Sequence, residues 1–157
     1  MANTFITLEG KRKLEAELVH LTRVERPIII EAIEVARAHG DLRENAEYHA
    51  AKEKQSMVEG RIQVISSKLA TAEVIDPSKI KEKKIVFGAT ITLLNTDTED
   101  KIKYQIVGDD EIDISKGKIS FLTPISKALI GKNVGDLVNI QIPKGEVEYE
   151  VLKIEYV

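Results

Sequence analysis

The chain of 157 residues contains no cysteine and no tryptophan, and aromatic residues make up only 4% of it. Without cysteine it can form neither disulfides nor thiolate-ligated metal sites, which is typical of proteins from a reducing cytoplasm. No apolar run approaches the roughly 20 residues that a membrane-spanning helix needs, and the N-terminus shows no signal-peptide pattern. We therefore expect a cytoplasmic protein without membrane contact, whose cores are mostly aliphatic.

The charge balance of the chain excludes an extended basic surface for nucleic-acid binding. Residues 1–76 carry 11 Lys and Arg against 13 Asp and Glu, a net charge of −2, and residues 77–157 carry 12 against 13, a net charge of −1. Nucleic-acid affinity depends mainly on neutralising phosphates, which neither half can do broadly. Any nucleic-acid contact should therefore be local and supported by a partner protein.

Two stretches of heptad pattern dominate the first half of the chain. The apolar seam of the second stretch is Tyr48, Ala51, Gln55, Val58, Ile62, Ile65, Leu69 and Ala72, and that of the first is Leu14, Leu18, Leu21, Ile28, Ala32 and Val35. Alternating spacings of three and four residues are typical of a coiled-coil seam. The pattern predicts two long helices that form an antiparallel hairpin.

Helix signals refine this prediction. Thr7 is expected to be the N-cap of the first helix, and Pro27 predicts a kink or local break near residues 23–26, with helix resuming through Ala38. Gly40 is expected just past the helix end, where a positive φ is favourable for glycine. A very short turn should then lead into the second helix.

Beyond the Asp76–Pro77 step the apolar period changes from 3.5 to 2, which indicates strands. The expected strands are residues 85–94, 101–107, 118–122, 136–142 and 146–157, with a short helix at 124–130. In the last strand the apolar parity switches after Val151, which predicts a bulge near Leu152. The fold class is therefore two-domain α+β: a hairpin (1–76), a linker (77–84) and an antiparallel β domain with one short helix (85–157).

Asp41 and Glu44 lie at the expected tip of the hairpin. One interpretation is helix capping, with Asp41 as N-cap and Glu44 completing a capping-box pattern. The other is metal chemistry, because residues three apart on a helix share a face and Mg²⁺ accepts one or two protein carboxylates. Two carboxylates alone make an open site, which needs its other ligands from a substrate phosphate or a partner.

The cationic side chains near the same tip are Arg37, Arg43, Lys52 and Lys54. They fit either a solvated surface with weak ion pairs or a small patch that contacts a phosphate or a nucleic-acid end. Zinc signatures, a glycine-rich phosphate loop and a nucleophile motif are all lacking. Nothing in the sequence supports a self-contained enzyme.

At the tip the chain resembles a known family, the bacterial Gre transcript-cleavage factors. The resemblance rests first on GDLRENAEYHAAKEKQ at residues 40–55, whose HAAK sequence is similar to the A-type branch of that family. It continues almost to the C-terminus, through EGRI at 59–62, VFGA at 86–89, IVGDDE at 106–111, PI at 124–125, ALIGK at 128–132, GD at 135–136 and YEVLKIEY at 149–156.

The resemblance implies a coiled-coil finger followed by an FKBP-like domain. In the family this domain docks at the rim of the secondary channel of bacterial RNA polymerase, and the finger enters the channel. The polymerase then cleaves the 3′ segment of backtracked nascent RNA, and elongation resumes. The factor is thus implied to be an accessory that activates the polymerase's own nuclease activity, and not an enzyme itself. We expect it to act as a monomer.

The resemblance also assigns roles to residues. Asp41 and Glu44 are implied to be the catalytic pair, which holds a second Mg²⁺ shared with the polymerase, bound only in the complex. Arg37, Arg43 and Lys52 are expected to steer the RNA. On the β domain, the strip Leu122, Thr123, Pro124 and Ile125 is either a polymerase-docking surface or ordinary helix-start packing.

Other classes of protein remain to be weighed. An FKBP-like chaperone or prolyl isomerase would need an aromatic-lined pocket, for which the second half offers few aromatic residues. A non-cleaving secondary-channel binder is disfavoured by the two tip acids. A plain coiled-coil adaptor leaves those acids unexplained.

Overall fold

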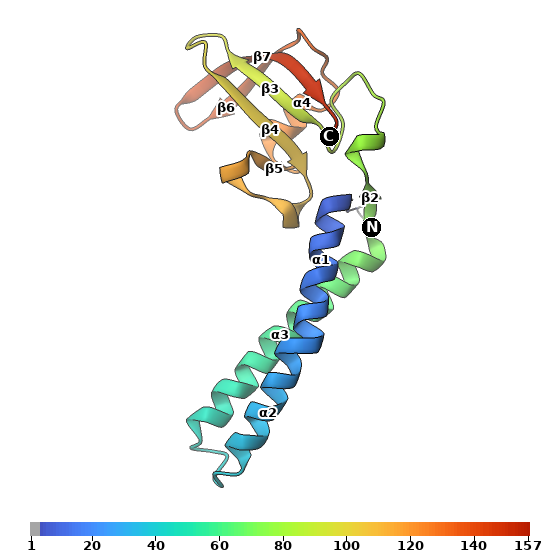
Figure 1. Ribbon diagram of the computed structural model, residues 1–157. Helices are drawn as coiled ribbons and strands as arrows, with labels where there is room; N and C mark the ends of the chain where they lie inside the picture. Colours follow the sequence, from blue (N-terminus) through green and yellow to red (C-terminus); the bar gives the residue numbers. More distant parts are fainter. Residues whose placement is uncertain (1–3) are drawn as a thin grey trace. The chain divides into compact units, whose positions relative to one another are not determined.

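The computed structural model describes residues 4–157 and divides into two compact units (Figure 1). One unit is a helical hairpin, Lys11–Thr71. The other, here called the β unit, comprises Ala72–Val157 together with the N-terminal residues through Gly10. The expected linker between residues 77 and 84 stays a prediction. The division into compact units assigns the N-terminal segment through Gly10 to the β unit and not to the hairpin.

The outgoing arm of the hairpin is helical in three successive parts. α1 (Leu8–His20) continues into a π-helical turn, η1 (Leu21–Glu25), and then into α2 (Arg26–Arg37). The predicted irregularity ahead of Pro27 is thus a wide turn and not a break. A π turn leaves backbone groups outside the regular α-helical ladder, so a proline that cannot donate is tolerated next to it.

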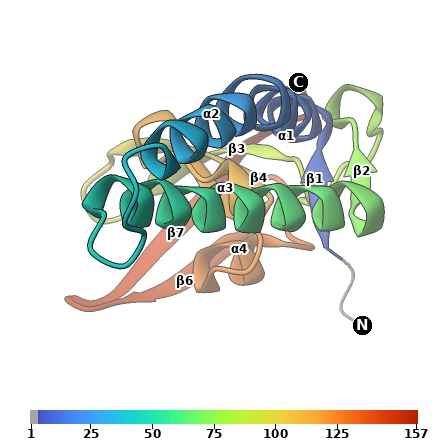
Figure 2. The ribbon, with the colours of Figure 1, turned by 90° about the horizontal axis from the view of Figure 1, so that it is seen from below.

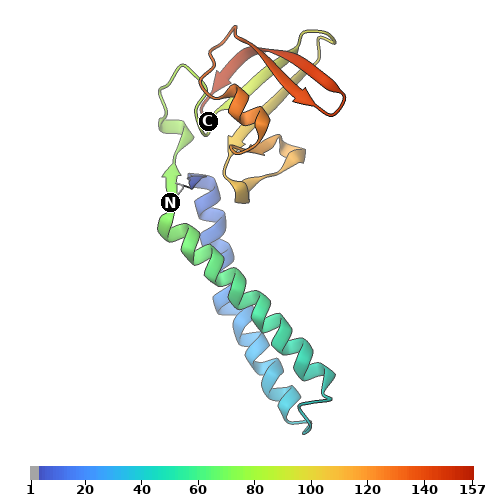
Figure 3. The same cartoon turned by 180° about the vertical axis from the view of Figure 1, so that it is seen from behind.

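The return arm is the single helix α3 (Ala46–Thr71), which lies beside the outgoing arm (Figure 3). Two bidentate ion pairs join the arms: Arg26 donates to Glu59 and Arg61 donates to Glu17, each with a shortest N–O distance of 2.7 Å. Their order along the chain shows that the arms are antiparallel. All eight residues of the second predicted seam are buried or half-buried, which confirms that part of the pattern.

The predicted seam of α2 is wrong by one residue. Ile28 and Val35 are each 54% exposed and Ala32 is also exposed. The buried residues are instead Ile29, Ile33 and Ala36. The π turn is the reason, because it uses one extra residue per turn and so advances every later side chain by one position around the helix.

The β unit contains a five-stranded sheet in the order β5-β4-β3-β7-β6 (Figure 1). Its strands are β3 (Thr90–Asn95), β4 (Lys101–Val107), β5 (Lys118–Ser120), β6 (Leu137–Ile142) and β7 (Gly145–Glu155). Helix α4 (Pro124–Leu129) packs Leu129 into a core with Ile91, Ile106 and Val151, all fully buried. The predicted bulge is confirmed, because Thr92 pairs with Lys153 and Leu93 with Val151, so Leu152 is skipped.

Other expectations for this unit are wrong. The sheet is mixed, since β5 runs parallel to β4 after a ten-residue excursion, residues 108–117, that carries the chain back to the same end. Residues 85–89 are not strand, although Ile85 is fully buried and bonds its backbone to Lys132 and Gly131. Between residues 72 and 157, three 3₁₀ turns accompany helix α4: η2 (Pro77–Lys79), η3 (Asp109–Glu111) and η4 (Ile114–Lys116).

The sequence pattern also missed a strand at the start of the chain. β1 (Phe5–Thr7) pairs in parallel with β2 (Glu73–Ile75), as Figure 2 shows. Phe5 packs against Phe87 and Phe121, with ring centroids 5.6 and 5.7 Å away. Thr7, as predicted, caps α1 by accepting a hydrogen bond from the backbone of Gly10. The N-terminal segment is thus an integral part of the β unit.

Candidate functional site at the hairpin tip

An eight-residue loop, residues 38–45, joins α2 to α3 and forms the tip. Asn45 organises it. Its Oδ1 accepts a hydrogen bond from the backbone N–H of Tyr48 at 3.0 Å, which is N-cap geometry, and its Nδ2 donates to the carbonyl of Ala36 at 2.6 Å. One side chain therefore starts α3 and ties it to the end of α2.

Sequence reasoning missed Asn45 and placed the cap at Asp41, which is wrong. The helix begins at Ala46, and Asp41 instead closes a local turn by accepting from the backbone N–H of Arg43 at 2.9 Å. The signal that could have identified the cap is an asparagine three residues before the first seam residue, Tyr48. Gly40 has the predicted positive φ, at 106°.

Asp41 and Glu44 both lie exposed on this loop. Neither residue belongs to a helix, so the two side chains do not share a helix face. The capping-box interpretation is wrong for the same reason, because it requires a helix that starts at Asp41. Within residues 4–157, Glu44 has no hydrogen bond or ion pair, and one carboxylate oxygen of Asp41 is unused. The two acids at the tip are therefore exposed to solvent, and each has at least one carboxylate oxygen available to a ligand.

These residues fit a shared magnesium ion but not a complete protein site. Carboxylate oxygens are the hard ligands that Mg²⁺ prefers, and it usually keeps several waters or binds substrate phosphates as well. No group of three or more metal-ligating side chains occurs among the described residues. The donor set is therefore that of an open site completed from outside the chain.

The three cations expected to steer RNA differ in their surroundings. The guanidinium of Arg37 lies 5.9 Å from the centre of the Tyr48 ring, a cation–π distance. Lys52 donates to Gln55 at 3.1 Å. Arg43 contributes backbone groups to the turn, since its N–H binds Asp41 and its carbonyl accepts from His49 at 2.8 Å. All three are exposed.

The strip Leu122–Ile125 on the β unit contains residues that fit helix-start packing and residues that fit a docking surface. Thr123 caps α4 by accepting from the backbone of Ser126 at 3.2 Å, and Pro124 begins that helix. Ile125 packs against the core, whereas Leu122 is 50% exposed. Helix-start packing thus accounts for Thr123 and Ile125, whereas Leu122 and Pro124 are exposed and available to a partner.

The aromatic residues of the β unit are engaged with one another. Phe87 and Phe121 pack edge to face at 5.5 Å, and Phe5 contacts both. The hydroxyl of Tyr156 donates to the carbonyl of Lys84 at 2.5 Å. Such packing is typical of a structural cluster and not of an aromatic-lined ligand pocket. In residues 4–157 no helix has the length and apolar character to cross a membrane.

Comparison with protein families gives two matches that together span most of the chain. "Transcription elongation factor, N-terminal" matches residues 4–74, and "Transcription elongation factor, GreA/GreB, C-term" matches residues 80–156. Taken with the hairpin and its acidic tip, they define the class of protein as a transcription elongation factor.

Curated relatives named transcription elongation factor GreA agree over nearly their whole length. The protein of Alkalilimnicola ehrlichii is 54% identical over 157 residues, covering 99% of each chain, and that of Hyphomonas neptunium is 56% identical over 151 residues, covering 96% of each. The chain belongs to the GreA/GreB family. Among solved structures, the GreA factor homolog 1 of Thermus thermophilus matches at 24% identity, with a TM-score of 0.45 and coverage of 98% and 99%.

Proposed function

We propose that this elongation factor stimulates the Mg²⁺-dependent cleavage of backtracked nascent RNA by bacterial RNA polymerase. The proposal is supported chiefly by the exposed pair Asp41 and Glu44 on the tip loop of a chain that belongs to the GreA/GreB family. Exposed acids at the end of a two-helix hairpin stabilise no core. They are suited to delivery into another molecule's site.

In this proposal Asp41 and Glu44 are the chain's ligands for a Mg²⁺ ion shared with the polymerase and bound only in the complex. When bound, Mg²⁺ lowers the pKa of a coordinated water and stabilises charge on phosphoryl oxygens. The chain contributes two negative charges to that cation. Because Arg43 already occupies one oxygen of Asp41, the orientation of this carboxylate is set before it reaches the polymerase.

The other tip residues position the acids and the RNA. Asn45 limits the movement of the loop by joining its two ends. Arg37, Arg43 and Lys52 contact the 3′ segment of the RNA through its phosphates, for which exposed cations at the tip are suited. The patch is small, which agrees with the net charge of −2 on residues 1–76.

The remaining parts of the chain serve delivery. The hairpin acts as a coiled-coil finger in the secondary channel, and the β unit acts as an FKBP-like domain that docks at the channel rim, with Leu122 and Pro124 as its exposed contacts. One copy enters the channel, in the bacterial cytoplasm. The factor is an accessory that activates the polymerase's own nuclease activity, which its membership of the GreA/GreB family supports.

A backtracked elongation complex with 3′-labelled RNA tests the proposal. The wild-type chain with Mg²⁺ should release short labelled fragments, whereas Asp41→Asn and Glu44→Gln should bind the polymerase normally and lose cleavage by about 10²-fold or more, as expected for a lost metal ligand. Glu53→Gln is the matched control, because Glu53 is an exposed acid on α3 outside the tip loop.

Normal cleavage by both Asp41→Asn and Glu44→Gln would contradict the proposal that these residues are metal ligands. Displacement of an authentic cleavage factor without any cleavage by the wild type would identify a non-cleaving channel binder instead.

A further inference from the structure

His49, on the first turn of α3, binds the tip loop twice. Its backbone N–H donates to the carbonyl of Asn45 at 3.1 Å, the first bond of the helix, and its ring Nε2 lies 2.8 Å from the carbonyl of Arg43. Because a carbonyl only accepts, Nε2 carries the hydrogen of the second bond. The two carbonyls belong to the residues on either side of Glu44. One helical residue therefore holds the chain both before and after this acid.

The bond from the His49 ring acts on the backbone that connects the two tip acids. The carbonyl of Arg43 and the N–H of Glu44 share one planar peptide unit, which also contains Cα of Glu44. The N–H of Arg43 donates in turn to Oδ1 of Asp41 at 2.9 Å. Arg43 is thus held at both of its backbone groups, by His49 at the carbonyl and by Asp41 at the N–H. Rotation of the segment between the acids is limited from both sides.

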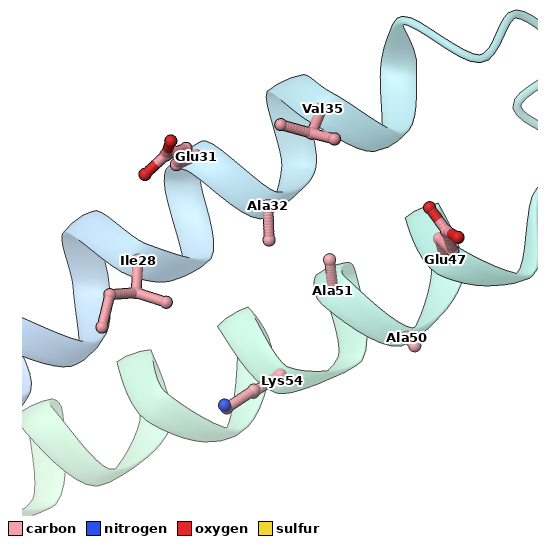
Figure 4. Close-up of a pocket in the computed structure, with 8 residues that line it drawn as sticks. All are labelled: Ile28, Glu31, Ala32, Val35, Glu47, Ala50, Ala51 and Lys54. Carbon is pink, nitrogen blue, oxygen red and sulfur yellow. The ribbon is translucent and has the colours of Figure 1, made fainter.

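Packing between the helices does not account for His49. Its side chain is exposed, whereas its neighbours Glu47 and Ala50 line the apolar groove between α2 and α3 (Figure 4). The ring of His49 contacts that of Tyr48 edge to face, with centroids 5.7 Å apart. Within residues 4–157, the carbonyl of Arg43 is the one hydrogen-bond partner of the ring. The side chain is therefore directed at the loop and not at the interface of the arms.

We propose that His49 is a positioning residue for the acidic tip, which orients Asp41 and Glu44 through the backbone of Arg43. The inference rests on the proposed function, in which these two acids are ligands of one ion shared with the polymerase. Among the described residues, the ring of His49 bonds to the loop backbone and to neither carboxylate. Its role is to hold the segment between the acids in one conformation before the tip meets the polymerase.

The physical reason is the demand that one shared cation makes on a loop. Two carboxylates on different residues must reach the cation together, and a loop that samples several conformations meets this demand only part of the time. A side chain based on a helix supplies a fixed point, since regular elements position groups more precisely than loops do. Asn45 joins the two ends of the loop, whereas His49 holds its interior, next to Glu44.

Cleavage of backtracked RNA separates positioning from binding. His49→Phe keeps an aromatic ring but removes the donor, and at saturating factor it should lower the cleavage rate about tenfold, the effect of losing about one hydrogen bond. The half-saturating concentration of factor, which reports polymerase binding, should stay unchanged. His49→Gln keeps an N–H donor on a side chain of similar reach, and its rate should stay within about threefold of the wild type. His20→Phe is the matched control, since His20 is an exposed histidine of α1.

NMR relaxation of the free chain gives a second readout, which needs neither polymerase nor metal. The order parameter of the Glu44 amide should be about 0.8 in the wild type and in His49→Gln, and should fall below about 0.6 in His49→Phe. The amide of an α3 residue such as Glu53 should stay ordered in all three chains.

Equal order parameters at Glu44 in the wild type and His49→Phe would overturn the proposal, and so would equal cleavage rates. A rate that falls only because polymerase binding weakens would also overturn it, since positioning leaves binding unchanged. If the wild type did not cleave at all, the proposed function would be wrong, and the relaxation data would still decide whether His49 orders the loop.

Discussion

The side-chain amide of Asn45 donates to the backbone carbonyl of Ala36 at 2.6 Å, which links the first residue before α3 to the last turn of α2. The same side chain accepts from the backbone of Tyr48. Between these two anchors lies the loop that carries Asp41 and Glu44. The geometry of the acidic tip therefore depends on one amide that is not itself a metal ligand.

Asn45→Ala should destabilise the hairpin by about 1 kcal/mol through the lost N-cap, measured by urea unfolding. Cleavage of backtracked RNA should fall further than polymerase binding, because the loop is less ordered but the rest of the chain is unchanged. Asn45→Asp separates the two contributions, since it keeps the capping oxygen and removes the donor to Ala36. Equal cleavage by all three chains would show that the tip needs no such link.

A paired glycine experiment tests how the N-terminal segment is held. Glu111 accepts hydrogen bonds from the backbone N–H groups of Thr7 at 3.0 Å and Gly108 at 2.9 Å, and from the Thr7 hydroxyl. A Cβ at Gly10 would lie 2.3 Å from the carboxyl carbon of Glu111. Gly10→Ala must displace this carboxylate and should destabilise the chain by roughly 1–3 kcal/mol.

Gly60→Ala is the opposite case. Gly60 lies inside α3, and a methyl group added there would meet nothing within 4 Å, so alanine should stabilise the hairpin by about 0.5–1 kcal/mol through its higher helix propensity. Thermal unfolding of both variants gives the comparison. Equal shifts of the same sign would contradict the role given to Glu111.

Acid should weaken the link between the hairpin arms. The hydrogen bond from Arg61, followed by its charge, holds the pKa of Glu17 below the ordinary value of 4.5, although burial acts in the opposite direction. Because the folded-state pKa is depressed, the stabilisation is present above the unfolded value and is lost as pH falls through the folded value. With the Glu17 side chain 38% exposed, it amounts to less than about 1 kcal/mol.

Urea unfolding at pH 7 and at pH 3 measures this contribution. The stability difference between the wild type and Glu17→Gln should be present at pH 7 and shrink at pH 3, since protonation makes the two side chains alike. A difference that stays constant with pH would show that the ion pair contributes nothing.

Local patterns predicted much of the fold because their physical causes are local. The seam of α3, the Thr7 cap, the positive φ of Gly40 and the bulge at Leu152 all follow from the spacing or type of neighbouring residues. The tip acids were also found from sequence. Their placement on a helix was wrong. Asp41 and Asn45 can both act as the N-cap of the second helix, and the hydrogen bond from Asn45 to the carbonyl of Ala36 favours the later start.

The sequence by itself determined that this chain forms a helical hairpin and a β unit, and that two acids stand at the hairpin's end. Only the tertiary structure decided which face of α2 is buried, since a single π turn rotates all later side chains and only packing against α3 reveals it. It also decided the parallel pairing of β1 with β2, whose residues are more than sixty positions apart. Such contacts depend on which distant segments meet, and no local period encodes that.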